Sequence, residues 1–348
     1  MPRQKAATIQ DVANRAKVSI STVSHVLNKT RHVEKTRNDR VLLAVKELGY
    51  RPNQLARSLR GAASKTIGLV ISDIREEFFA GLTKAIESAA NDHGYLVTLC
   101  DSEEDPEKEG RYIEILADRG VDGIILAPVD RASPIPAPRD GKLPIVLVDR
   151  RSEVSNLDFV GIENARSTRE AVRHLVSLGK KRLGFIGHEM AIATMGERAE
   201  AFMAAMGELG LADEARILTL RSKAGDNKAK VRRWIAKAPA LDGIICGNAN
   251  LCFLTFSVLD EAGITVPDPM AIVSFDDPDC YRFMRCPITA IRQPTEKIGA
   301  TAFEVLLARV EGRAAPGRDS MEPSSFIIPA RLIVRESCGS PRQGGDNG

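Results

Sequence analysis

The 348-residue chain lacks the features that mark membrane and exported proteins. It has one Trp and four Tyr, and no apolar run approaches the roughly 20 residues of a membrane-spanning helix. The N-terminal MPRQKAATIQD contains no apolar segment typical of a secretory signal. These absences predict a cytoplasmic globular protein.

Cysteine and histidine are scarce and scattered. The six cysteines stand at positions 100, 246, 252, 280, 286 and 338 without a CxxC pair, and the five histidines form no cluster with them. This spacing argues against a structural zinc site and against a disulfide framework. We expect buried free thiols in a reducing compartment, and neither a metal nor a cofactor.

Signatures of enzymes are missing as well. No GxGxxG phosphate loop occurs, and GFIGHEM lacks a third glycine at the required spacing. No local pattern suggests a Ser-His-acid or Cys-His arrangement. An α/β enzyme such as a dehydrogenase, which turnover with NAD or a chromogenic substrate would reveal, is one alternative, and a transport binding protein is another. The chain is predicted not to be an enzyme.

What the sequence does contain is a patterned segment at residues 8–28. Apolar residues recur at helical spacing after Thr8, a typical N-cap, and Ser19 can cap a second helix. The inner face of that second helix consists of Val23, Val26 and Leu27. Its opposite face carries Ser21, Ser24, His25 and Asn28. This small polar face suits a helix that enters the DNA major groove, and a solvated face of a helical bundle is the alternative.

Charge separates the N-terminal segment from the rest of the chain. Residues 1–65 contain 14 Lys and Arg against 4 Asp and Glu, a formal charge of +10. The whole chain carries +3, so residues 66–348 carry −7 by subtraction. A basic segment on an acidic body is typical of a nucleic-acid-binding module joined to another domain.

Two further segments complete this region. A third helix is expected over residues 37–48, ended by Gly49. Its inward residues are expected to be Val41, Leu42, Val45 and Leu48. Residues 53–60 make about two helical turns, too short to be stable alone in water. Their small side chains permit close pairing with a second copy, and a flexible linker is the alternative.

TIQDVANRAKVSISTVSHVLN, followed by ELGYRPNQLARSLR, resembles the head and hinge of the LacI family of bacterial transcriptional regulators. The resemblance is specific in roughly the first 60 positions and extends over nearly all of the chain. It implies that Ile20, Ser21 and His25 face base edges. It implies phosphate contacts from Thr8, Thr22, Asn28, Lys29 and Arg31. Many relatives have Arg at the position of His25, and His cannot offer the same fork to guanine, so the half-site is expected to differ.

The resemblance also implies a paired hinge. In the family, two hinge helices fold together on the operator, and the position of Leu59 wedges into the minor groove, where apolar insertion kinks DNA. Asn53, Leu55 and Ala56 belong to the same hinge contact. The implied partners are a pseudo-palindromic double-stranded operator and a second copy of the chain. No leucine heptads follow RLIVRES, so a coiled-coil tetramer is not expected.

From Thr66 onward, apolar runs of strand length alternate with amphipathic helical stretches. The runs are TIGLVIS, YLVTLC, GIILAP, PIVLVD, FVGI, RLGFIG, ARILTL, GIICG, AIVSFD and ITAIRQ. This alternation predicts doubly wound parallel sheets in two α/β subdomains, like a type I periplasmic binding protein. The expected domains are a helix-turn-helix head at 1–52, a hinge helix and linker at 53–64, a core at 65–338 and a disordered tail at 339–348. The subdomains are expected at about 65–163 with 293–324, and at 164–292 with 325–338.

Ligands of open α/β sheets bind beyond the carboxyl ends of the strands, so a site is expected in the cleft between the subdomains. The polar and aromatic residues at those places are Asp73, Phe78, Phe79, Asp149, Asn164, Arg198, Asn248 and Asp276. Each of them alone can be a helix cap or a solvated group. Together they predict a sugar-like effector, because carboxylates and amides bridge hydroxyls, Arg offers a fork, and an aromatic face covers a ring.

The resemblance supports the aromatic pair, Asp149, Arg198, Asn248 and Asp276 as cleft residues. The chain departs from the family where relatives have Asn-Pro before the aromatic pair, since Glu76-Glu77 stands here. This acidic pair favours a neutral or cationic effector, and solvated carboxylates at a helix start explain it equally well. The preferred function is a repressor whose effector alters DNA binding, and the sequence specifies neither the effector, the direction of its effect nor the operator.

Overall fold

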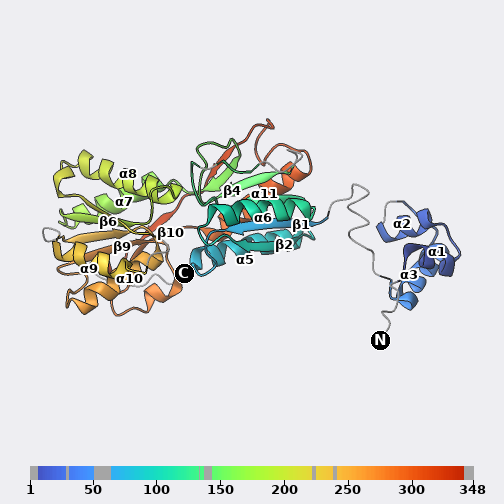
Figure 1. The fold of residues 1–348 in the computed structure, drawn as a ribbon, viewed down its shortest axis with the longest axis horizontal. Coiled ribbons are helices and arrows are strands. Elements are labelled where there is room, and N and C mark those ends of the chain that lie inside the picture. Colours follow the sequence, from blue (N-terminus) through green and yellow to red (C-terminus); the bar gives the residue numbers. More distant parts are fainter. Residues whose placement is uncertain are drawn as a thin grey trace. The chain divides into compact units, whose positions relative to one another are not determined.

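The structure, a computed structural model, describes residues 7–28, 31–50, 64–132, 134–136, 143–221, 225–237 and 241–340. It divides into a head, which extends to Ser64, and a core from Lys65 onward (Figure 1). Some residues with predicted roles lie outside the described residues: Lys29, Asn53, Leu55, Ala56, Leu59 and most of the tail. Within the part that the structure describes, no helix is long and apolar enough to cross a membrane.

The head contains α1 (Ile9–Ala16), α2 (Ile20–Asn28) and α3 (Lys35–Leu48). Thr8 begins α1 through a capping box, in which the Asp11 N–H donates to Thr8 Oγ1 at 3.3 Å and the Thr8 N–H donates to Asp11 Oδ2 at 2.8 Å. Ser19 caps α2 by accepting a hydrogen bond from the Thr22 N–H at 3.2 Å. These contacts confirm both predicted caps.

Small apolar side chains from all three helices form the core of the head. Its buried members are Val12, Ala13, Ala16, Val23, Val26, Val41 and Ala44. The predicted inward orientation of Leu42 and Leu48 is wrong, since these side chains are 50% and 36% exposed. Position 42 lies about 100° around the helix from Val41, so Ala44 shares the buried face with Val41 and Leu42 does not.

The core unit is built on two sheets. The strands of the first are β1 (Thr66–Ile71), β2 (Leu96–Asp101), β3 (Gly123–Leu126), β4 (Ile145–Val148), β5 (Asp158–Gly161) and β11 (Ser325–Ile327). The strands of the second are β6 (Leu183–Gly187), β7 (Arg216–Thr219), β8 (Gly243–Cys246), β9 (Ala271–Phe275), β10 (Thr289–Arg292) and β12 (Arg331–Ile333). Each of the ten predicted strand segments overlaps one of β1 to β10.

The strand orders are β11-β5-β4-β3-β1-β2 and β12-β10-β9-β8-β6-β7. Every pairing among the described strands is parallel except β10 with β12. The two sheets therefore repeat one doubly wound plan, and the predicted fold class is confirmed. In each sheet the order reverses beside the first strand, β1 or β6, where open sheets bind ligands.

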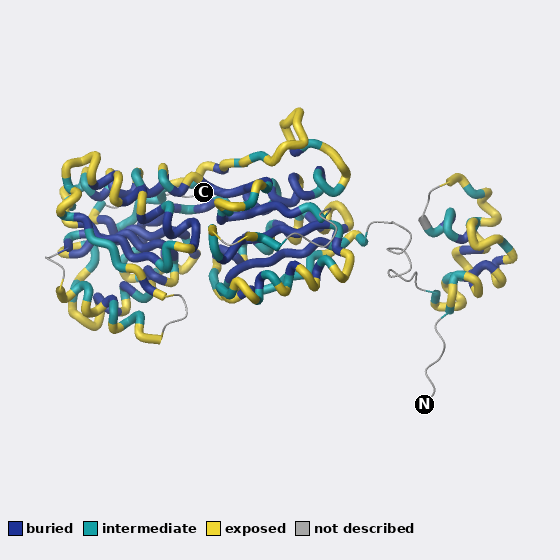
Figure 2. The backbone as a smooth tube through the Cα atoms, turned by 45° about the horizontal axis from the view of Figure 1, so that its top comes forward, coloured by how far each residue is buried: buried dark blue, intermediate teal, exposed yellow. Residues whose placement is uncertain are grey.

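Helices cover both faces of each sheet, and the central strands between these helices are buried (Figures 1 and 2). They are α5 (Glu77–Asp92), α6 (Pro106–Asp118), α7 (Asn164–Ser177), α8 (Ala193–Glu208), α9 (Asn227–Lys237), α10 (Ala249–Glu261) and α11 (Thr295–Val310). Short 3₁₀ helices are η1 (Ala212–Glu214), η2 (Asp279–Arg282) and η3 (Glu336–Cys338). Helices α5 and α11 pack against each other, as do α7 and α8.

The chain passes between the sheets after β5, after β10 and after β11. The prediction that residues from 325 onward join the second subdomain is wrong for β11, which pairs with β5 in the register Ser325↔Phe159. The crossing therefore falls between Ile327 and Arg331. An edge strand of three residues is too short to show a pattern of alternating apolar and polar residues. Its pairing is therefore set by the folded core, in which β5 offers a free edge.

The six cysteines are all free. Cys246, Cys252 and Cys338 are buried, as expected. Cys280 is exposed, and Cys100 and Cys286 are partly exposed, so the expectation of burial is wrong for these three. Cys280 lies in η2, outside the apolar layers that the periodic segments form.

Candidate functional site

The outer face of α2 is polar and accessible. Ile20 is 37% exposed, Ser21 is exposed, and Thr22 and His25 are partly exposed. The hydroxyl oxygen of Ser19 lies 2.8 Å from that of Ser21 and 2.8 Å from that of Thr22. A hydroxyl cluster at a helix N-terminus is a favourable place for a phosphate oxygen.

The turn between α1 and α2 is fixed from α3. Lys17 adopts a left-handed conformation with φ of +52°. Arg40 of α3 donates to the carbonyl of Lys17 at 3.0 Å and also to the carbonyl of Ala16. The third helix therefore sets the angle at which the polar face of α2 is presented.

Two other residues predicted to contact phosphates lie in the described part of the head. Thr8 is exposed, and its hydroxyl donates to Asp11 Oδ2 at 2.7 Å within the capping box. Arg31 is exposed just beyond α2. The side chain of Asn28 lies outside the described residues.

In the core unit, two aspartates stand at equivalent strand ends. Asp149 directly follows β4 of the first sheet, and Asp276 directly follows β9 of the second. Both have φ of +64°, a region that Asp tolerates better than most residues, and both are buried. Burial raises the pKa of Asp149 to about 6 and raises the pKa of Asp276 as well, and in both cases Arg198 opposes that rise. Strained, buried carboxylates are typical of functional sites.

Arg198 of α8 is the cation that interacts with both aspartates. It is only 2% exposed, and burial lowers its pKa. Its Nε donates to Asn164 Oδ1 at 2.8 Å, and its Nη1 donates to the Gly247 carbonyl at 2.6 Å. The guanidinium also stacks on the Phe275 ring, 3.9 Å from the centroid. These contacts fix the orientation of the fork before any ligand arrives.

Asn164 is held in place from its other side. Its Nδ2 donates to Glu197 Oε2 at 2.7 Å, so both polar atoms of this buried amide are used. The structure therefore brings Asn164, Arg198, Asp149 and Asp276 into one electrostatic network. The first two come from α7 and α8 on the second sheet.

Arg150 extends this network toward the first sheet. Its two terminal nitrogens donate to the two carboxylate oxygens of Glu104 at 2.7 and 2.8 Å, and its Nε lies 3.6 Å from Asp149 Oδ2. Arg150 is 5% exposed, and its Nε has no hydrogen-bond partner among the residues that the structure describes. Glu104 was not predicted from the sequence, because it lies 46 residues from Arg150 and in no motif.

Glu76 and Glu77 connect the two subdomains. Glu76 Oε1 accepts from Asn248 Nδ2 at 2.9 Å and from Asn250 Nδ2 at 3.4 Å. Glu77 Oε1 accepts from the Asp279 N–H at 3.2 Å. The start of α5 on the first sheet is thus bonded to the start of α10 and to η2 on the second. Asn248 also caps α10 by accepting from the Leu251 N–H at 2.9 Å.

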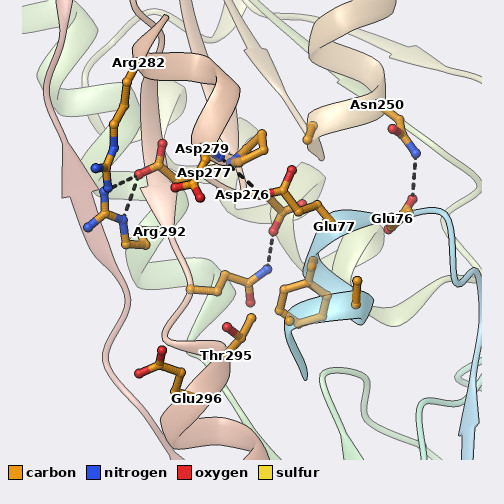
Figure 3. Close-up of a pocket in the computed structure, with 16 residues that line it drawn as sticks. Glu76, Glu77, Asn250, Asp276, Asp277, Asp279, Arg282, Arg292, Thr295 and Glu296 are labelled. Atoms are coloured by element: carbon orange, nitrogen blue, oxygen red, sulfur yellow. Dashed lines mark hydrogen bonds and ion pairs between the residues drawn. The ribbon is translucent and has the colours of Figure 1, made fainter. Parts of the chain in front are cut away.

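A cavity of about 420 Å³ lies at this junction (Figure 3). It is lined by Glu76, Glu77, Phe78, Ala80, Gly81, Ala249, Asn250, Asp276, Asp277, Pro278, Asp279, Arg282, Arg292, Gln293, Thr295 and Glu296. Its volume is within the usual range for small-molecule sites. Of the predicted effector residues, Phe78 and Asp276 line it.

The other predicted effector residues do not line the cavity. Asp73 bonds to Arg75 at 2.7 and 2.8 Å, which lowers the pKa of Asp73 against the opposing effect of burial. Phe79 is 1% exposed and packs edge-on against Phe78, with ring centroids 5.1 Å apart. Asn248 reaches the cavity wall through Glu76.

Gln293, at the end of β10, was not predicted. It is 8% exposed, and its Nε2 donates to Asp276 Oδ1 at 2.7 Å. Its Oε1 is buried and has no hydrogen-bond partner in the described part of the chain. The same holds there for Ser72 Oγ and His188 Nδ1, which follow β1 and β6. These three buried polar atoms at strand ends are available for hydrogen bonds to a bound molecule.

Residues 8–53 match the model of the lacI family of bacterial regulatory proteins. Residues 64–336, well over half of the chain, match that of periplasmic binding proteins and the sugar binding domain of the LacI family. The chain belongs to the LacI family. This assignment confirms the family predicted from the head and hinge sequence.

LacI-family relatives match the chain over nearly its whole length. The ribose operon repressor of Halalkalibacterium halodurans is 32% identical over 341 residues, which cover 98% of each chain. The transcriptional repressor PurR of Haemophilus influenzae is 32% identical over 342 residues, covering 96% of this chain and 99% of the repressor.

Solved structures share the fold. The Lac repressor dimer bound to operator and the anti-inducer ONPF superposes with a TM-score of 0.82 at 22% identity, covering 96% of this chain and 99% of the repressor. The complex of the transcriptional regulator CelR with cellobiose has a TM-score of 0.67 at 27% identity, covering 95% of this chain and 99% of that regulator.

Proposed function

We propose that this LacI-family protein is a sequence-specific transcriptional repressor whose DNA binding is controlled by a small molecule in the core cleft. The observation that carries the proposal is the combination of a capped helix-turn-helix head and a two-sheet core with an internal network of buried charges. The relatives of similar length are repressors. A repressor acts on chromosomal DNA, so its place of action is the cytoplasm, and it catalyses no reaction.

The DNA-binding part of the proposal assigns roles within the head. Ile20, Ser21 and His25 face base edges from the outer side of α2, and Thr8, Thr22, Asn28, Lys29 and Arg31 hold phosphates. A dimer places two heads on a pseudo-palindromic operator. The hinge residues Asn53, Leu55, Ala56 and Leu59 contact the minor groove at the centre.

The effector part of the proposal rests on the charged network. Asp149 and Asp276 accept hydroxyl hydrogens, and Arg198 donates from Nη2, because its Nε and Nη1 are already bonded. Asn164 and Asn248 position these groups, and Phe78 covers an apolar face of the ligand. A sugar-like ligand suits this mixture of acceptors, donors and an aromatic face.

The test is selection of bound sequences from a random DNA pool with the full chain, followed by binding curves. We expect a palindrome with a fixed centre, and His25→Ala should relax the preference at one position of each half-site. An exchange of His25 that leaves the selected sequence unchanged would remove this residue from base readout. Recovery of unrelated, salt-sensitive sequences would contradict the proposal.

A matched control separates specific from general effects. Lys84 lies on α5 of the core and bonds to Glu87 at 2.8 Å. Lys84→Ala removes one positive charge, as Arg31→Ala does, but from outside the head. Only the exchange in the head should weaken DNA binding.

A further inference from the structure

The cavity between α5, α10, α11 and η2 has an unusual charge balance. Six carboxylates line it: Glu76, Glu77, Asp276, Asp277, Asp279 and Glu296. Two cations line it, Arg282 and Arg292. Figure 3 shows Arg292 directed at Asp277, to which it bonds at 2.6 and 2.8 Å. Asp277 is neutralised further by Arg335, and burial raises the pKa of Glu76 to about 8, so this group is mostly neutral at pH 7. Glu77, Asp276, Asp279 and Glu296 are the other acidic groups that line the cavity, and Arg282 is the remaining lining cation.

The amide of Gln293 indicates that a ligand of this cavity should donate hydrogen bonds. Because a carboxylate only accepts hydrogen bonds, the bond to Asp276 must come from Nε2, and Oε1 is therefore an acceptor. Gln293 is 8% exposed, it lines the cavity, and its Oε1 has no donor within the described part of the chain. A buried acceptor without a donor costs free energy that a ligand with N–H or O–H groups recovers.

The amide donors at this wall are already in use. Asn248 and Asn250 both donate to Glu76, and the Asp279 N–H donates to Glu77. An anionic group would therefore meet carboxylates and few free donors. An ammonium group offers three donors and no acceptor, and it is attracted by the carboxylates and by an aromatic ring such as that of Phe78, which lines the cavity.

We propose that this cavity is a subsite for an ammonium group, and that the effector is a polyhydroxylated compound that carries an amine. The subsite rests on the proposed function and deepens it, because Asp276, which lines the cavity, also interacts with Arg198, and because the subsite names the class of the effector. The hydroxyls engage the central network, while the amine lies among Gln293, Asp276 and Glu77. Compounds that carry a carboxylate or phosphate at this end are excluded by charge.

The test is calorimetric titration of the full chain, without DNA, with matched sugars. The probes are the 2-amino-2-deoxy, neutral and uronic acid forms of glucose, galactose and mannose, with putrescine as an amine that has no hydroxyls. We expect one amino sugar to bind at least about tenfold more tightly than its neutral form, since a desolvated charge pair gives about 1.4 kcal/mol or more. The uronic acids should not bind.

Several outcomes would overturn the subsite. It is wrong if a neutral sugar or a uronic acid binds as tightly as the amino form, or if no amine in the panel binds. Tight binding of putrescine alone would keep the ammonium site and overturn the polyol. None of these measurements uses DNA, so failure here leaves operator selection intact, and failure of operator selection leaves these titrations interpretable.

Paired variants locate the effect. Glu77→Gln keeps the acceptor for the Asp279 N–H but removes a charge at the cavity, and it should weaken the amino sugar about threefold to tenfold while leaving neutral sugars unchanged. Glu87→Gln removes the same charge from the same helix at the surface, where Glu87 pairs with Lys84. It should change nothing, and equal effects of the two variants would contradict the subsite.

Discussion

At the scale of single residues, the cleft contains buried carboxylates, and Arg198 compensates their negative charge. Buried carboxylates are tolerated only when cations and hydrogen bonds compensate their lost hydration. Asp149 and Asp276 come from different sheets, and Arg198 lowers the pKa of both against the effect of burial. The fork of Arg198 is held by a side-chain amide and a backbone carbonyl, so a ligand encounters an oriented donor.

This arrangement predicts the result of Arg198→Lys. A lysine keeps the charge but cannot hold Asn164 and the Gly247 carbonyl while stacking on Phe275. We expect effector affinity to fall at least about tenfold and stability to fall by about 1–3 kcal/mol, the usual cost of unpaired buried polar groups. Calorimetric titration and thermal unfolding measure the two effects. Arg166→Lys, on the exposed side of α7, is the control.

The raised pKa of Glu76 predicts that the stability of the folded chain depends on pH. Burial raises its pKa to about 8, with Asp276, Glu104 and Asp73 adding to the rise and Arg150 opposing it. An unfolded Glu titrates near its ordinary value of 4.5, so between about pH 4.5 and 8 the folded chain binds more protons than the unfolded chain. Stability must therefore fall as pH rises through this window.

The comparison of wild type with Glu76→Gln isolates this group, because the amide does not titrate. Urea unfolding at pH 5, 6, 7 and 8 should show the stability of the wild type decreasing relative to the variant. A constant difference across the window would mean that Glu76 is ionised throughout. Glu87→Gln, at the surface of α5, should give no slope.

At the scale of elements, Asn248 has two roles that substitutions can separate. Its Oδ1 caps α10, and its Nδ2 donates to Glu76 of the facing subdomain. Asn248→Asp keeps the cap but places a carboxylate against Glu76. Asn248→Ala removes both roles and should cost about 1 kcal/mol for the cap alone.

We therefore expect Asn248→Asp to open the cleft above about pH 8, where Glu76 is ionised, while α10 stays formed. Hydrogen exchange should accelerate at the start of α5, and α10 should remain protected. Asn248→Ala should accelerate exchange in both helices. Loss of protection in α10 of the Asp variant would show that the cap, and not the contact between subdomains, governs this end. Asn250→Ala, which removes only the 3.4 Å contact, is the control.

The elements differ in how well they can be predicted from the sequence. Ten strands, most of them buried, can be recognised in the sequence as apolar runs, and residues directly after them, such as Asp149 and Asp276, are therefore expected at the carboxyl ends of the sheets. Strand β11 was not predicted, because three residues are too few to show the two-residue period of a strand. Glu104 and Gln293 were not predicted, because their partners lie 46 and 17 residues away in the sequence, so only the folded chain brings them together.

At the scale of the whole molecule, the +10 charge of residues 1–65 against −7 for the remainder predicts strongly salt-dependent DNA binding. Each lysine or arginine on a phosphate contributes about one unit to the slope of log affinity against log salt. Arg31→Ala should reduce the slope by about one unit and weaken all DNA sequences alike. Fluorescence anisotropy at several salt concentrations measures this. An unchanged slope would remove Arg31 from the phosphate contacts, and Lys84→Ala is the matched control.

Effector binding in the core and DNA binding by the head are expected to be thermodynamically linked. A ligand that alters DNA affinity by some factor must have its own affinity altered by the same factor when DNA is bound, because the two orders of binding reach one state. Couplings of this kind are typically about 1–3 kcal/mol, or about 5-fold to 150-fold. We expect the amino sugar that binds the free chain to bind the operator complex with an affinity changed by the factor it imposes on DNA.

Titrating the sugar into the chain and into its operator complex, and DNA into the chain with and without saturating sugar, closes this cycle. A factor that differs from one, and is equal in both arms as linkage requires, shows that the sugar regulates DNA binding, and whether it lowers or raises DNA affinity distinguishes an inducer from a co-repressor. Arg198→Lys should weaken the sugar in both arms and leave DNA binding without sugar unchanged. A sugar that binds tightly with a factor of one in both arms would bind the cleft without regulating the head, because equal affinity for two states shifts neither.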